Sequence, residues 1–401
     1  MIPERVERRA RWVLDSIGAH QVGFGDDVPY RAAAWDQVER GERPVGDDLA
    51  EAFFHLARIE EQEGPRDEHG RFRAEWSCLD PLDPALEQLR VRLGVEPPRW
   101  DGARFAVALT HDVDSPWRWT RAGLRGAASR LKHNVRASRL GPAVREATGL
   151  AAAPFHRLRG TDPNWRFEQI VREERRGGAS GSTFFVLAGH NDPHDGAAPE
   201  TYARLRPRLV ETLLGAGAEI GLHGSYTAAT DPHRLAAEKA ALEAEAGPVR
   251  GQRYHYLRVD PHANLADVES AGLAYDTTLG FPEAVGFRAG IAHPFRPWSF
   301  ARDEPLNVLE IPLAAMDATL AEERYLGLAA KRAEPHLMGL LDRAAESGGG
   351  FAILWHPDRF DPLTSGGWDR LYSRLLEGIR VRGGACMSAA ELASSHSTWS
   401  K

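Results

Sequence analysis

The sequence FAVALTHDVD, from Phe105 to Asp114, gives the clearest indication of the fold. It begins as an uninterrupted apolar run, as expected of a strand that is buried on both faces. Similar runs recur at residues 182–187, 218–222, 254–257, 308–313 and 351–355. Stretches with helical patterning separate most of these runs, at residues 201–214, 232–246 and 320–346. The alternation predicts an α/β fold with a parallel sheet, open or closed into a barrel, and with its chemistry at the carboxyl ends of the strands.

The composition argues against several classes of protein. The chain has 401 residues and a net charge of −7, so its overall charge does not indicate a nucleic-acid binder. Its two cysteines, Cys78 and Cys386, lie far apart and form neither a disulfide framework nor a cysteine-based zinc motif. The first residues lack the apolar core of a signal peptide, and no apolar run approaches the roughly 20 residues that cross a bilayer. The sequence therefore predicts a cytoplasmic protein.

Two parts are expected along the chain. Residues 1–100 are predicted to form a small region of helices and loops. One of its helices is marked by an N-cap, a proline at the first position and a glycine after the end, at Asp83, Pro84 and Gly94. Two prolines at 97 and 98 then break the chain, and residues 101–401 carry the alternation of strands and helices.

Residues 118–160 do not fit this alternation. They contain ten Lys or Arg residues and a single acid, Glu146, among scattered leucine, valine and alanine residues. A solvated pair of helices inserted in the barrel explains this composition. A basic amphipathic helix pair that rests on a membrane surface or on an anionic substrate explains it as well.

Two carboxylates share one face of the first strand where that strand ends. Because side chains alternate along a strand, Asp112 and Asp114 point one way, whereas His111 and Val113 point the other way. Neighbouring carboxylates are costly there unless a cation compensates their charge, and a metal ion would leave one of them as a ligand and the other as a base. The alternative is structural, because the Asp-Ser-Pro sequence that follows is also typical of a turn.

Histidines follow two later predicted strands, and a third histidine, His255, lies within another. His223 and His356 come directly after apolar runs, and imidazole is both a common metal ligand and a common general acid. In an extended segment Arg253 shares a face with His255, and its guanidinium group can orient a carboxylate. Each histidine also has an ordinary explanation, as an exposed polar side chain or as a partly buried imidazole bonded to a carbonyl.

Together these segments resemble the polysaccharide deacetylase family, the NodB-like carbohydrate esterases. The resemblance covers roughly residues 104–395 and follows the family's order: an aspartate-containing strand end, STFFV at 182–186, a His motif at 223–225, a Gly-x-Arg strand at 251–253 and a final His-Pro at 356–357. The chain is also similar to an uncharacterised bacterial branch that carries an extra N-terminal region. The motifs shared with that branch are THDVD, LHxSY, RxHYL, GFRAG and MDxTL.

The resemblance implies an irregular (β/α) barrel with fewer than eight strands and a small, mainly helical N-terminal region. It also implies hydrolysis of an N-acetyl group from an amino sugar. In this chain Asp112 resembles the catalytic base, Arg253 the group that orients the base, and His356 the catalytic acid. Asp317 resembles the acidic partner of that histidine.

The resemblance implies a divalent metal, with Zn²⁺ as the favoured ion, held by Asp114 and His223. The family has a second metal-binding histidine four residues after the first, and here that position is Thr227. We expect His255 to replace it, because one Asp and two His leave open coordination positions for water and substrate. Weaker candidates for the third ligand are His233 and His262.

The sequence thus predicts a metal-dependent hydrolase that deacetylates an amino-sugar unit of a glycan precursor or glycoconjugate, which can be lipid-linked. One alternative is another amide hydrolase on the same scaffold, such as a sugar deformylase or an enzyme that opens a small cyclic amide. A second alternative is a catalytically silent glycan-binding protein. No nucleic-acid partner is expected, and residues 118–160 offer a peripheral membrane contact.

Overall fold

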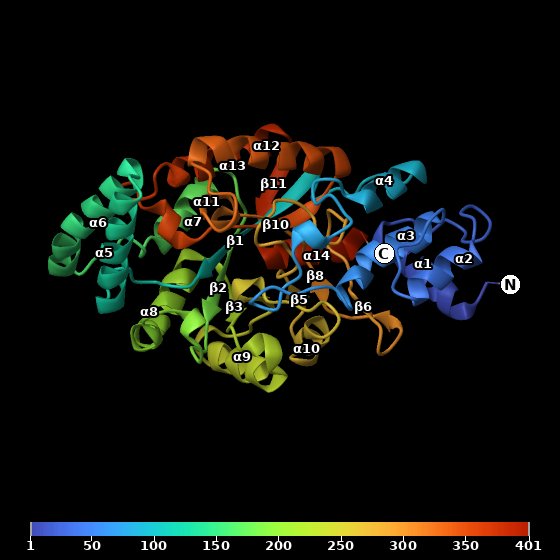
Figure 1. Ribbon diagram of the computed structural model, residues 1–401, viewed down its shortest axis with the longest axis horizontal. Coiled ribbons are helices and arrows are strands. Elements are labelled where there is room, and N and C mark those ends of the chain that lie inside the picture. Colours follow the sequence, from blue (N-terminus) through green and yellow to red (C-terminus); the bar gives the residue numbers. More distant parts are fainter. Residues whose placement is uncertain (1, 400–401) are drawn as a thin grey trace.

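The computed structural model describes the backbone of residues 2–399 and the side chains of residues 2–396. One parallel sheet curls into a partly closed barrel with helices on its outside (Figure 1). Its strands follow the order β8 (Leu309–Glu310), β5 (Tyr275–Asp276), β4 (Gly251–Tyr254), β3 (Glu219–Gly224), β2 (Thr183–Leu187), β1 (Phe105–Val113), β10 (Gly350–Leu354) and β9 (Leu313–Met316). A further strand, β11 (Gly384–Met387), pairs with the first half of β1. The predicted α/β barrel is confirmed, but the expectation of fewer than eight strands is wrong, because eight lie along this path.

Helices connect the strands and cover the outer face of the sheet (Figure 1). They are α7 (Phe167–Arg176), α8 (Pro199–Ala216), α9 (Pro232–Ala246), α10 (Asn264–Ser270), α12 (Ala330–Ser347) and α13 (Trp368–Val381). The last helix, α14 (Ala389–Trp399), contacts β1. The predicted bounds of α9 are confirmed, and Asp231 caps it by accepting from two amide groups of its first turn. The single helix predicted over 320–346 is wrong, because a loop at 322–329 separates α11 (Asp317–Ala321) from α12.

The central strand β1 is buried along its whole length, with a different set of neighbours on each side. Phe105, Val107 and Leu109 pack in the large core beneath the helices. Ala106 and Ala108 pack in a second core inside the barrel. Small side chains suit the concave face because the sheet curls around it. The alternation that buries both cores is the same one that carries an aspartate into the barrel at the end of the strand.

Two of the apolar runs predicted to be strands have a different structure. The run at 254–257 is not a strand: β4 ends at Tyr254, and a 3₁₀ turn follows at His255–Leu257. Tyr256 and Leu257 have positive φ angles of 60° and 52°, which a strand cannot accommodate. The run at 308–313 is divided between β8 and β9, which lie at opposite ends of the sheet. Burial alone does not distinguish a strand from a buried turn.

The residues before β1 form helices and loops, as the sequence predicts. The helices are α1 (Glu4–Ser16), α2 (Ala32–Glu39), α3 (Asp48–Leu56) and α4 (Ala85–Arg92). Their apolar side chains belong to the same core as the outer face of the barrel. The predicted N-cap at Asp83 is wrong, because Pro84 takes the cap position and Asp83 instead accepts a hydrogen bond from the Gln88 side chain. A domain boundary near residue 100 stays a prediction.

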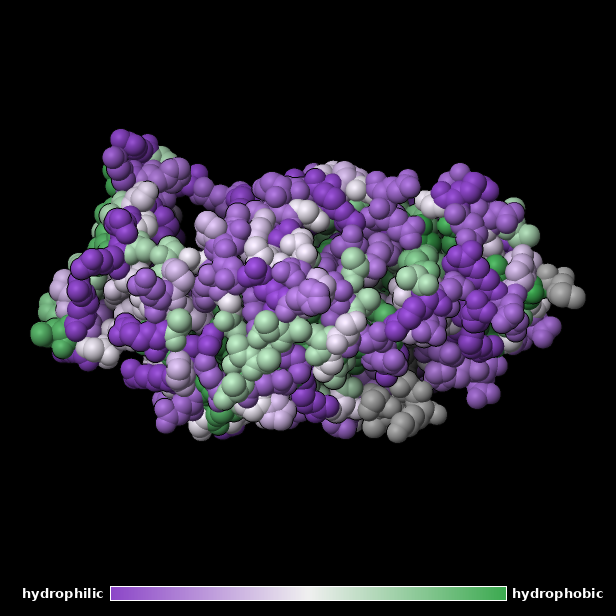
Figure 2. Space-filling view, turned by 90° about the horizontal axis from the view of Figure 1, so that it is seen from below, coloured by the Kyte–Doolittle hydropathy of each residue, from purple (hydrophilic) through white to green (hydrophobic). Residues whose placement is uncertain are grey.

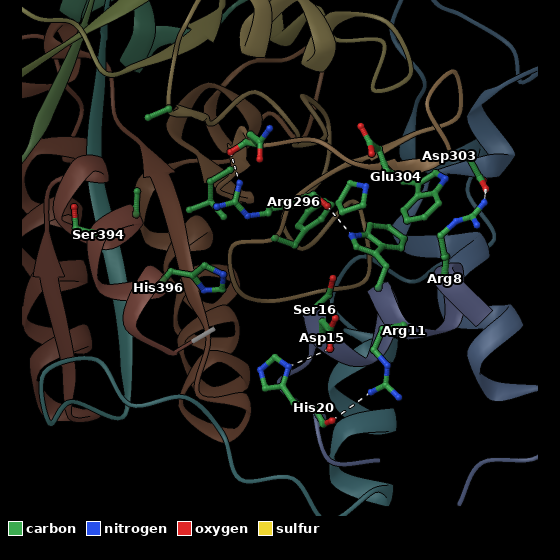
Figure 3. Close-up of a pocket in the computed structure, with 18 of the residues that line it drawn as sticks. Arg8, Arg11, Asp15, Ser16, His20, Arg296, Asp303, Glu304, Ser394 and His396 are labelled. Carbon is green, nitrogen blue, oxygen red and sulfur yellow. Dashed lines mark hydrogen bonds and ion pairs between the residues drawn. The ribbon is translucent and has the colours of Figure 1, made fainter. Parts of the chain in front are cut away.

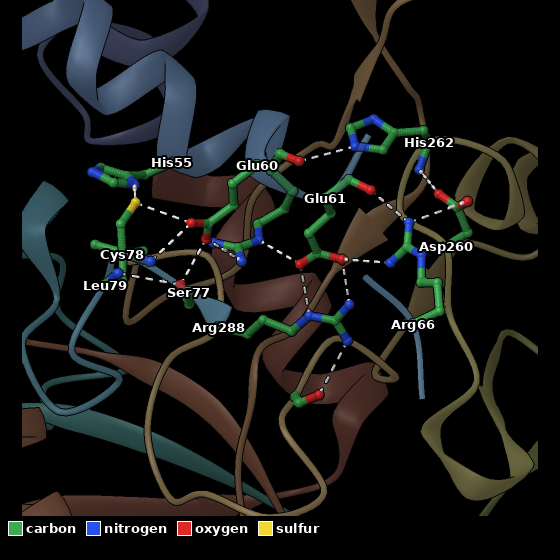
Figure 4. Close-up of polar contacts among 12 residues, drawn as sticks. His55, Glu60, Glu61, Arg66, Ser77, Cys78, Leu79, Asp260, His262 and Arg288 are labelled. Atoms are coloured by element: carbon green, nitrogen blue, oxygen red, sulfur yellow. Dashed lines mark hydrogen bonds and ion pairs between the residues drawn. The ribbon is translucent and has the colours of Figure 1, made fainter. Parts of the chain in front are cut away.

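A buried ion cluster fastens this N-terminal region to the barrel (Figure 4). Glu61 is fully buried and accepts hydrogen bonds from the guanidinium groups of Arg58 and Arg288. Arg288 belongs to the GFRAG motif, so this motif has a structural partner 227 residues away in sequence. Burial alone would raise the pKa of Glu61, but the two guanidinium charges outweigh it and lower the pKa to about 2.

Residues 118–160 form an antiparallel helix hairpin, α5 (Arg121–Arg136) and α6 (Leu140–Arg159), at one end of the elongated molecule (Figure 1). The N-terminal helices α1–α3 lie at the other end. Among the residues described, no helix is both long enough and apolar enough to cross a membrane. Cys78 and Cys386 are both free, so the prediction of no disulfide is confirmed for this pair.

Candidate metal centre and active site

The carboxyl ends of β4, β3, β1 and β10 bring the predicted site residues to one edge of the sheet. Asp112 lies near the end of β1, and Asp114 follows directly after that strand. His223 in β3 stands opposite Arg253 in β4 in the parallel register. His356 comes two residues after the end of β10, the other neighbour of β1. Parallel strands make this convergence possible, because their carboxyl ends all point the same way.

Asp114, His223 and His255 offer ligand atoms that all lie within 4.8 Å of one another. The Oδ1 atom of Asp114 is 3.3 Å from Nε2 of His223 and 3.6 Å from Nε2 of His255. One carboxylate and two imidazoles match the donor set of a catalytic Zn²⁺ or Fe²⁺ site, with positions left open for water and substrate. Among the side chains described, this is the one group of its kind.

Both imidazoles are oriented with Nε2 toward the carboxylate. Nδ1 of His223 is 2.9 Å from the backbone oxygen of Arg253, and Nδ1 of His255 is 3.1 Å from Oδ1 of Asp195. Each Nδ1 must carry the proton to donate to these oxygens, so each Nε2 keeps a free lone pair. A metal-binding histidine is held in this way by its second nitrogen.

Two of these ligand atoms are buried without a partner. Oδ1 of Asp114 and Nε2 of His223 make no hydrogen bond to any described residue. Buried polar atoms are normally satisfied, and a divalent cation between the two would satisfy both. The nearby imidazoles also favour ionised Asp114: burial opposes ionisation, but the electrostatic effects of His255, His356 and His223 outweigh it and lower the pKa of the carboxyl group. The donor set therefore fits a divalent metal.

His255 reaches this group from a turn and not from a strand, in contrast to the prediction. The chain leaves β4 at Tyr254, and the positive φ angles at Tyr256 and Leu257 reverse its direction directly after His255. Non-glycine residues with positive φ are strained and tend to occur where a structure holds a functional group in place.

The other candidates for a third ligand do not join the group. Thr227 begins a 3₁₀ turn at Ala228–Thr230 and offers no imidazole at the position where the family has its second histidine. Nε2 of His262 is 3.0 Å from the backbone oxygen of Arg58, on the side of the N-terminal region. His233 lies exposed in the first turn of α9.

Asp112 and Arg253 form a buried ion pair beside the three ligands. The Nη1 atom of Arg253 donates to Oδ1 of Asp112 at 2.8 Å, and both side chains are almost fully buried. The guanidinium group also donates to the backbone oxygen of Thr277 and lies over the Phe185 ring. Oδ2 of Asp112 is 3.7 Å from Nε2 of His223. One carboxylate oxygen is thus held by Arg253, while the other faces the ligand group.

His356 and Asp317 form a second oriented pair on the opposite side of Asp114. Nδ1 of His356 is 2.6 Å from Oδ1 of Asp317, and Arg359 donates to the other oxygen of that carboxylate. Nε2 of His356 is 3.7 Å from Oδ2 of Asp114. Burial disfavours the imidazolium form, but the charges of Asp317, Asp114 and Asp112 outweigh it and raise the pKa of His356 to about 10. This imidazole therefore carries a proton at neutral pH, as a general acid must.

These groups lie where two lobes of one cleft meet. The larger lobe has a volume of about 180 Å³ and the smaller about 130 Å³, and both are lined by Asp112, Asp114 and His356. Further residues of the larger lobe are Arg71, Tyr256, Arg324 and Tyr325. Those of the smaller lobe include Ser115, Asn164 and Arg359. A substrate bound across the junction would place one half in each lobe.

Several residues of the cleft were not predicted from the sequence. Asp195 orients His255 and also accepts from the amide of Tyr226, which lies beyond β3. It comes from a loop after β2, so no strand end marks it in the sequence. Arg71 comes from the N-terminal region, where it bonds to Asp67 and to the backbone oxygen of Tyr256. The N-terminal region therefore forms part of the cleft wall.

A larger cavity, of about 650 Å³, lies at the amino-terminal end of strands β5 and β8 (Figure 3). Its polar side chains are largely engaged with one another or with the backbone. Arg8 pairs with Asp303, His20 with Asp15, and Arg11 donates to the backbone oxygen of His20. This cavity contains no metal-ligand group among the described residues. Volume therefore does not identify the reactive site here, whereas the chemistry of the lining residues does.

The chain has the fold of two solved hydrolase structures. One is the Puue allantoinase, with a TM-score of 0.50 and 15% identity over 76% of this chain and 95% of that one. The other is described as a probable polysaccharide deacetylase from Pseudomonas aeruginosa PAO1, with a TM-score of 0.50 and 14% identity over 76% of this chain and 96% of that one. No family model matches the sequence, and no curated protein matches it. At such identities the likeness shows a shared (β/α) barrel fold.

Proposed function

We propose that this chain is a metal-dependent hydrolase that removes an N-acetyl group from an amino-sugar unit of a glycan precursor or glycoconjugate. The observation that carries the proposal is the Asp114–His223–His255 ligand group set between a buried Asp–Arg pair and a buried Asp–His pair. Amide hydrolysis needs a base for the attacking water and an acid for the leaving amine, and the two pairs supply one of each.

In this mechanism Asp114, His223 and His255 hold a divalent metal, which supplies Lewis-acid activation of water and of the amide carbonyl when it is bound. Asp112, held by Arg253, accepts the proton of the attacking water. His356 then donates its proton to the amide nitrogen as the carbon–nitrogen bond breaks, and Asp317 stabilises the imidazolium form until that step. The products are a carboxylic acid and a free amine.

Membership of the polysaccharide deacetylase family is part of the proposal. It is supported by the order of the sequence motifs and by the barrel fold shared with a probable member. The residues that the motifs name lie together at one edge of the sheet. This chain differs from the family pattern in one ligand, because His255 from the β4 turn stands in for the histidine replaced by Thr227.

A second candidate is the hydrolysis of a small cyclic amide. The larger lobe of the cleft is small, at about 180 Å³, and Arg71 and Arg324 are among the residues that line it. A compact, polar ring fits a lobe of this size better than an extended glycan does. One of the two structures that share the fold is an allantoinase, and the same scaffold could serve a sugar deformylase. A catalytically silent glycan-binding protein remains the non-enzymatic alternative.

The test combines metal content with product analysis. Purified protein is analysed for metals, stripped with a chelator, reloaded with Zn²⁺, and incubated with N-acetyl and N-formyl amino sugars and with cyclic amides. The proposal predicts zinc-dependent release of acetate together with a free amine. The Asp114→Ala variant should lose both metal and activity, whereas Asp112→Asn should keep the metal and lose activity. Ring opening without acetate release would favour the second candidate, and no turnover of any substrate by the metal-loaded protein would favour the silent protein.

A further inference from the structure

The α5–α6 hairpin projects from the barrel and packs mainly on itself (Figure 1). Its own small core contains Trp119, Ala127 and Ala153. At its base, Asp162 accepts hydrogen bonds from the amides of Arg118 and Trp119. The hairpin is therefore an ordered projection that contacts the barrel through a few side chains, such as Arg118 with Thr364 and Arg139 with Glu323.

One face of α6 exposes a continuous apolar stripe. Its members recur at steps of four, three, four, four and three residues, so they lie in one row along the helix: Leu140, Val144, Ala147, Ala151, Phe155 and Leu158. All six are exposed, and the large ones are 78%, 63%, 66% and 86% exposed for Leu140, Val144, Phe155 and Leu158. The opposite face, with Ala143, Gly149 and Ala153, is buried. A soluble helix normally buries its apolar face, whereas α6 exposes one apolar row in addition to its packed face.

The hairpin also carries a strong positive charge. Its one acid, Glu146, is already paired with Arg118 and Arg130, and Arg139 pairs with Glu323. Within residues 2–396, the other seven basic side chains have no carboxylate partner: Arg121, Arg125, Lys132, Arg136, Arg145, Arg157 and Arg159. Figure 2 shows green, hydrophobic side chains among purple ones at the outer left edge, where the hairpin lies.

We propose that the α5–α6 hairpin docks on an anionic lipid surface, with the apolar stripe of α6 in the headgroup region. An amphipathic helix with basic residues beside its apolar row lies in the plane of such an interface. The unpaired Arg and Lys side chains attract anionic headgroups, as on the cytoplasmic leaflet. A second copy of the chain is a poorer occupant of the stripe, because two facing hairpins would bring their unpaired positive charges together.

The hairpin is linked to the wall of the cleft. Arg139, at the start of α6, forms an ion pair with Glu323. Glu323 lies between Glu322 and Arg324, and these two residues line the larger lobe. A docked hairpin would hold the cleft beside the lipid surface, where a lipid-linked substrate would reach it. The docking itself does not depend on the reaction, so it can be tested whatever the substrate is.

The test uses the full chain and vesicle sedimentation. Vesicles of phosphatidylcholine with about 30% phosphatidylglycerol should bind the protein, and pure phosphatidylcholine vesicles should not, because the basic residues need anionic headgroups. Salt at roughly 0.5 M should release the protein, since it screens the charges. The Phe155→Ser/Leu158→Ser and Arg157→Glu/Arg159→Glu variants should each weaken binding at least about tenfold.

A matched control removes exposed apolar residues elsewhere. Val91 and Val381 are 66% and 67% exposed, so Val91→Ser/Val381→Ser should bind vesicles as the unchanged protein does. Circular dichroism should show that the stripe variants stay folded, because their residues are exposed. Equal binding to neutral vesicles, or unchanged binding by both hairpin variants, overturns the proposal. A concentration-dependent dimer that the stripe variants abolish, with no vesicle binding, overturns it in favour of a second copy.

Discussion

The cleft and the junction with the N-terminal region both bury charged clusters. They differ in whether the carboxylate oxygens of the cluster have hydrogen-bond partners. At the junction each oxygen of Glu61 accepts from two guanidinium groups, those of Arg58 and Arg288 on one oxygen and those of Arg288 and Arg66 on the other (Figure 4). In the cleft, Oδ1 of Asp114 and Nε2 of His223 have no partner among the described residues. Both oxygens of the Glu61 carboxylate are satisfied, which stabilises the fold, although Nη1 of Arg58 beside it has no partner among the described residues. A carboxylate oxygen and an imidazole nitrogen that are left unsatisfied side by side can instead bind a ligand between them.

The largest effect is expected in the cleft. Replacing Asp112 with Asn keeps the shape and the contact with Arg253 but removes the base, so activity should fall about 10³-fold. Metal content and melting temperature should stay near those of the unchanged protein. Asp342→Asn on the exposed surface of α12 is the control and should keep full activity. Full activity of Asp112→Asn would show that the base lies elsewhere.

At the junction the same kind of change should affect stability instead. Glu61→Gln leaves the buried guanidinium group of Arg288 without its counter-charge and that of Arg58 with Glu60 alone, which should lower the free energy of unfolding by about 3–5 kcal/mol. Denaturant unfolding measures this loss. Glu63→Gln, at an exposed position nearby, should change little. A Glu61→Gln protein as stable as the original would contradict the structural role of the cluster.

The junction also predicts how stability depends on pH. The pKa of Glu61 is lowered from 4.5 to about 2 by the Arg288 and Arg58 charges, against the opposing effect of burial. Because the folded pKa is the lower one, the stabilisation is complete above about pH 4.5 and is lost as the pH falls toward 2, by about 3 kcal/mol in total. Unfolding curves between these pH values should show the loss, and Glu61→Gln should flatten it. An equal slope in both proteins would assign the dependence to other carboxyl groups.

A smaller effect is expected at the residue that orients a ligand without touching the metal. Asp195→Asn weakens the acceptor for Nδ1 of His255, so Zn²⁺ affinity should fall about 10- to 100-fold. Competition with a chromogenic chelator measures the change. Asp192→Asn, in the same loop but bonded to His194, should bind Zn²⁺ normally. Equal loss in both variants would point to a general distortion of the loop.

The two regions also differ in how far the sequence predicts them. The strand ends mark Asp112, Asp114, His223 and His356, because an apolar run followed by an ionisable residue is visible without any structure. The structure brings these four side chains together. The fold follows from the same alternation of strands and helices, with α9 predicted at its observed bounds.

The features of the site and of the junction that the sequence does not predict are formed by loops. The turn at His255–Leu257 has the apolar and aromatic residues of a strand, and tertiary contacts override that preference. Asp195 and Arg71 reach the cleft from loops, and Glu61 finds Arg288 across 227 residues. Loop conformations depend on such distant partners, which leave no periodic signal in the chain.

We propose above all that Asp114, His223 and His255 together hold one divalent metal. Anomalous X-ray diffraction at the zinc edge, from crystals of the Zn²⁺-loaded protein, tests it most directly. We expect one strong peak about 2.0–2.2 Å from a carboxylate oxygen of Asp114 and from Nε2 of both histidines. A peak that lacks His255, or a metal bound elsewhere with this cleft empty, would contradict it.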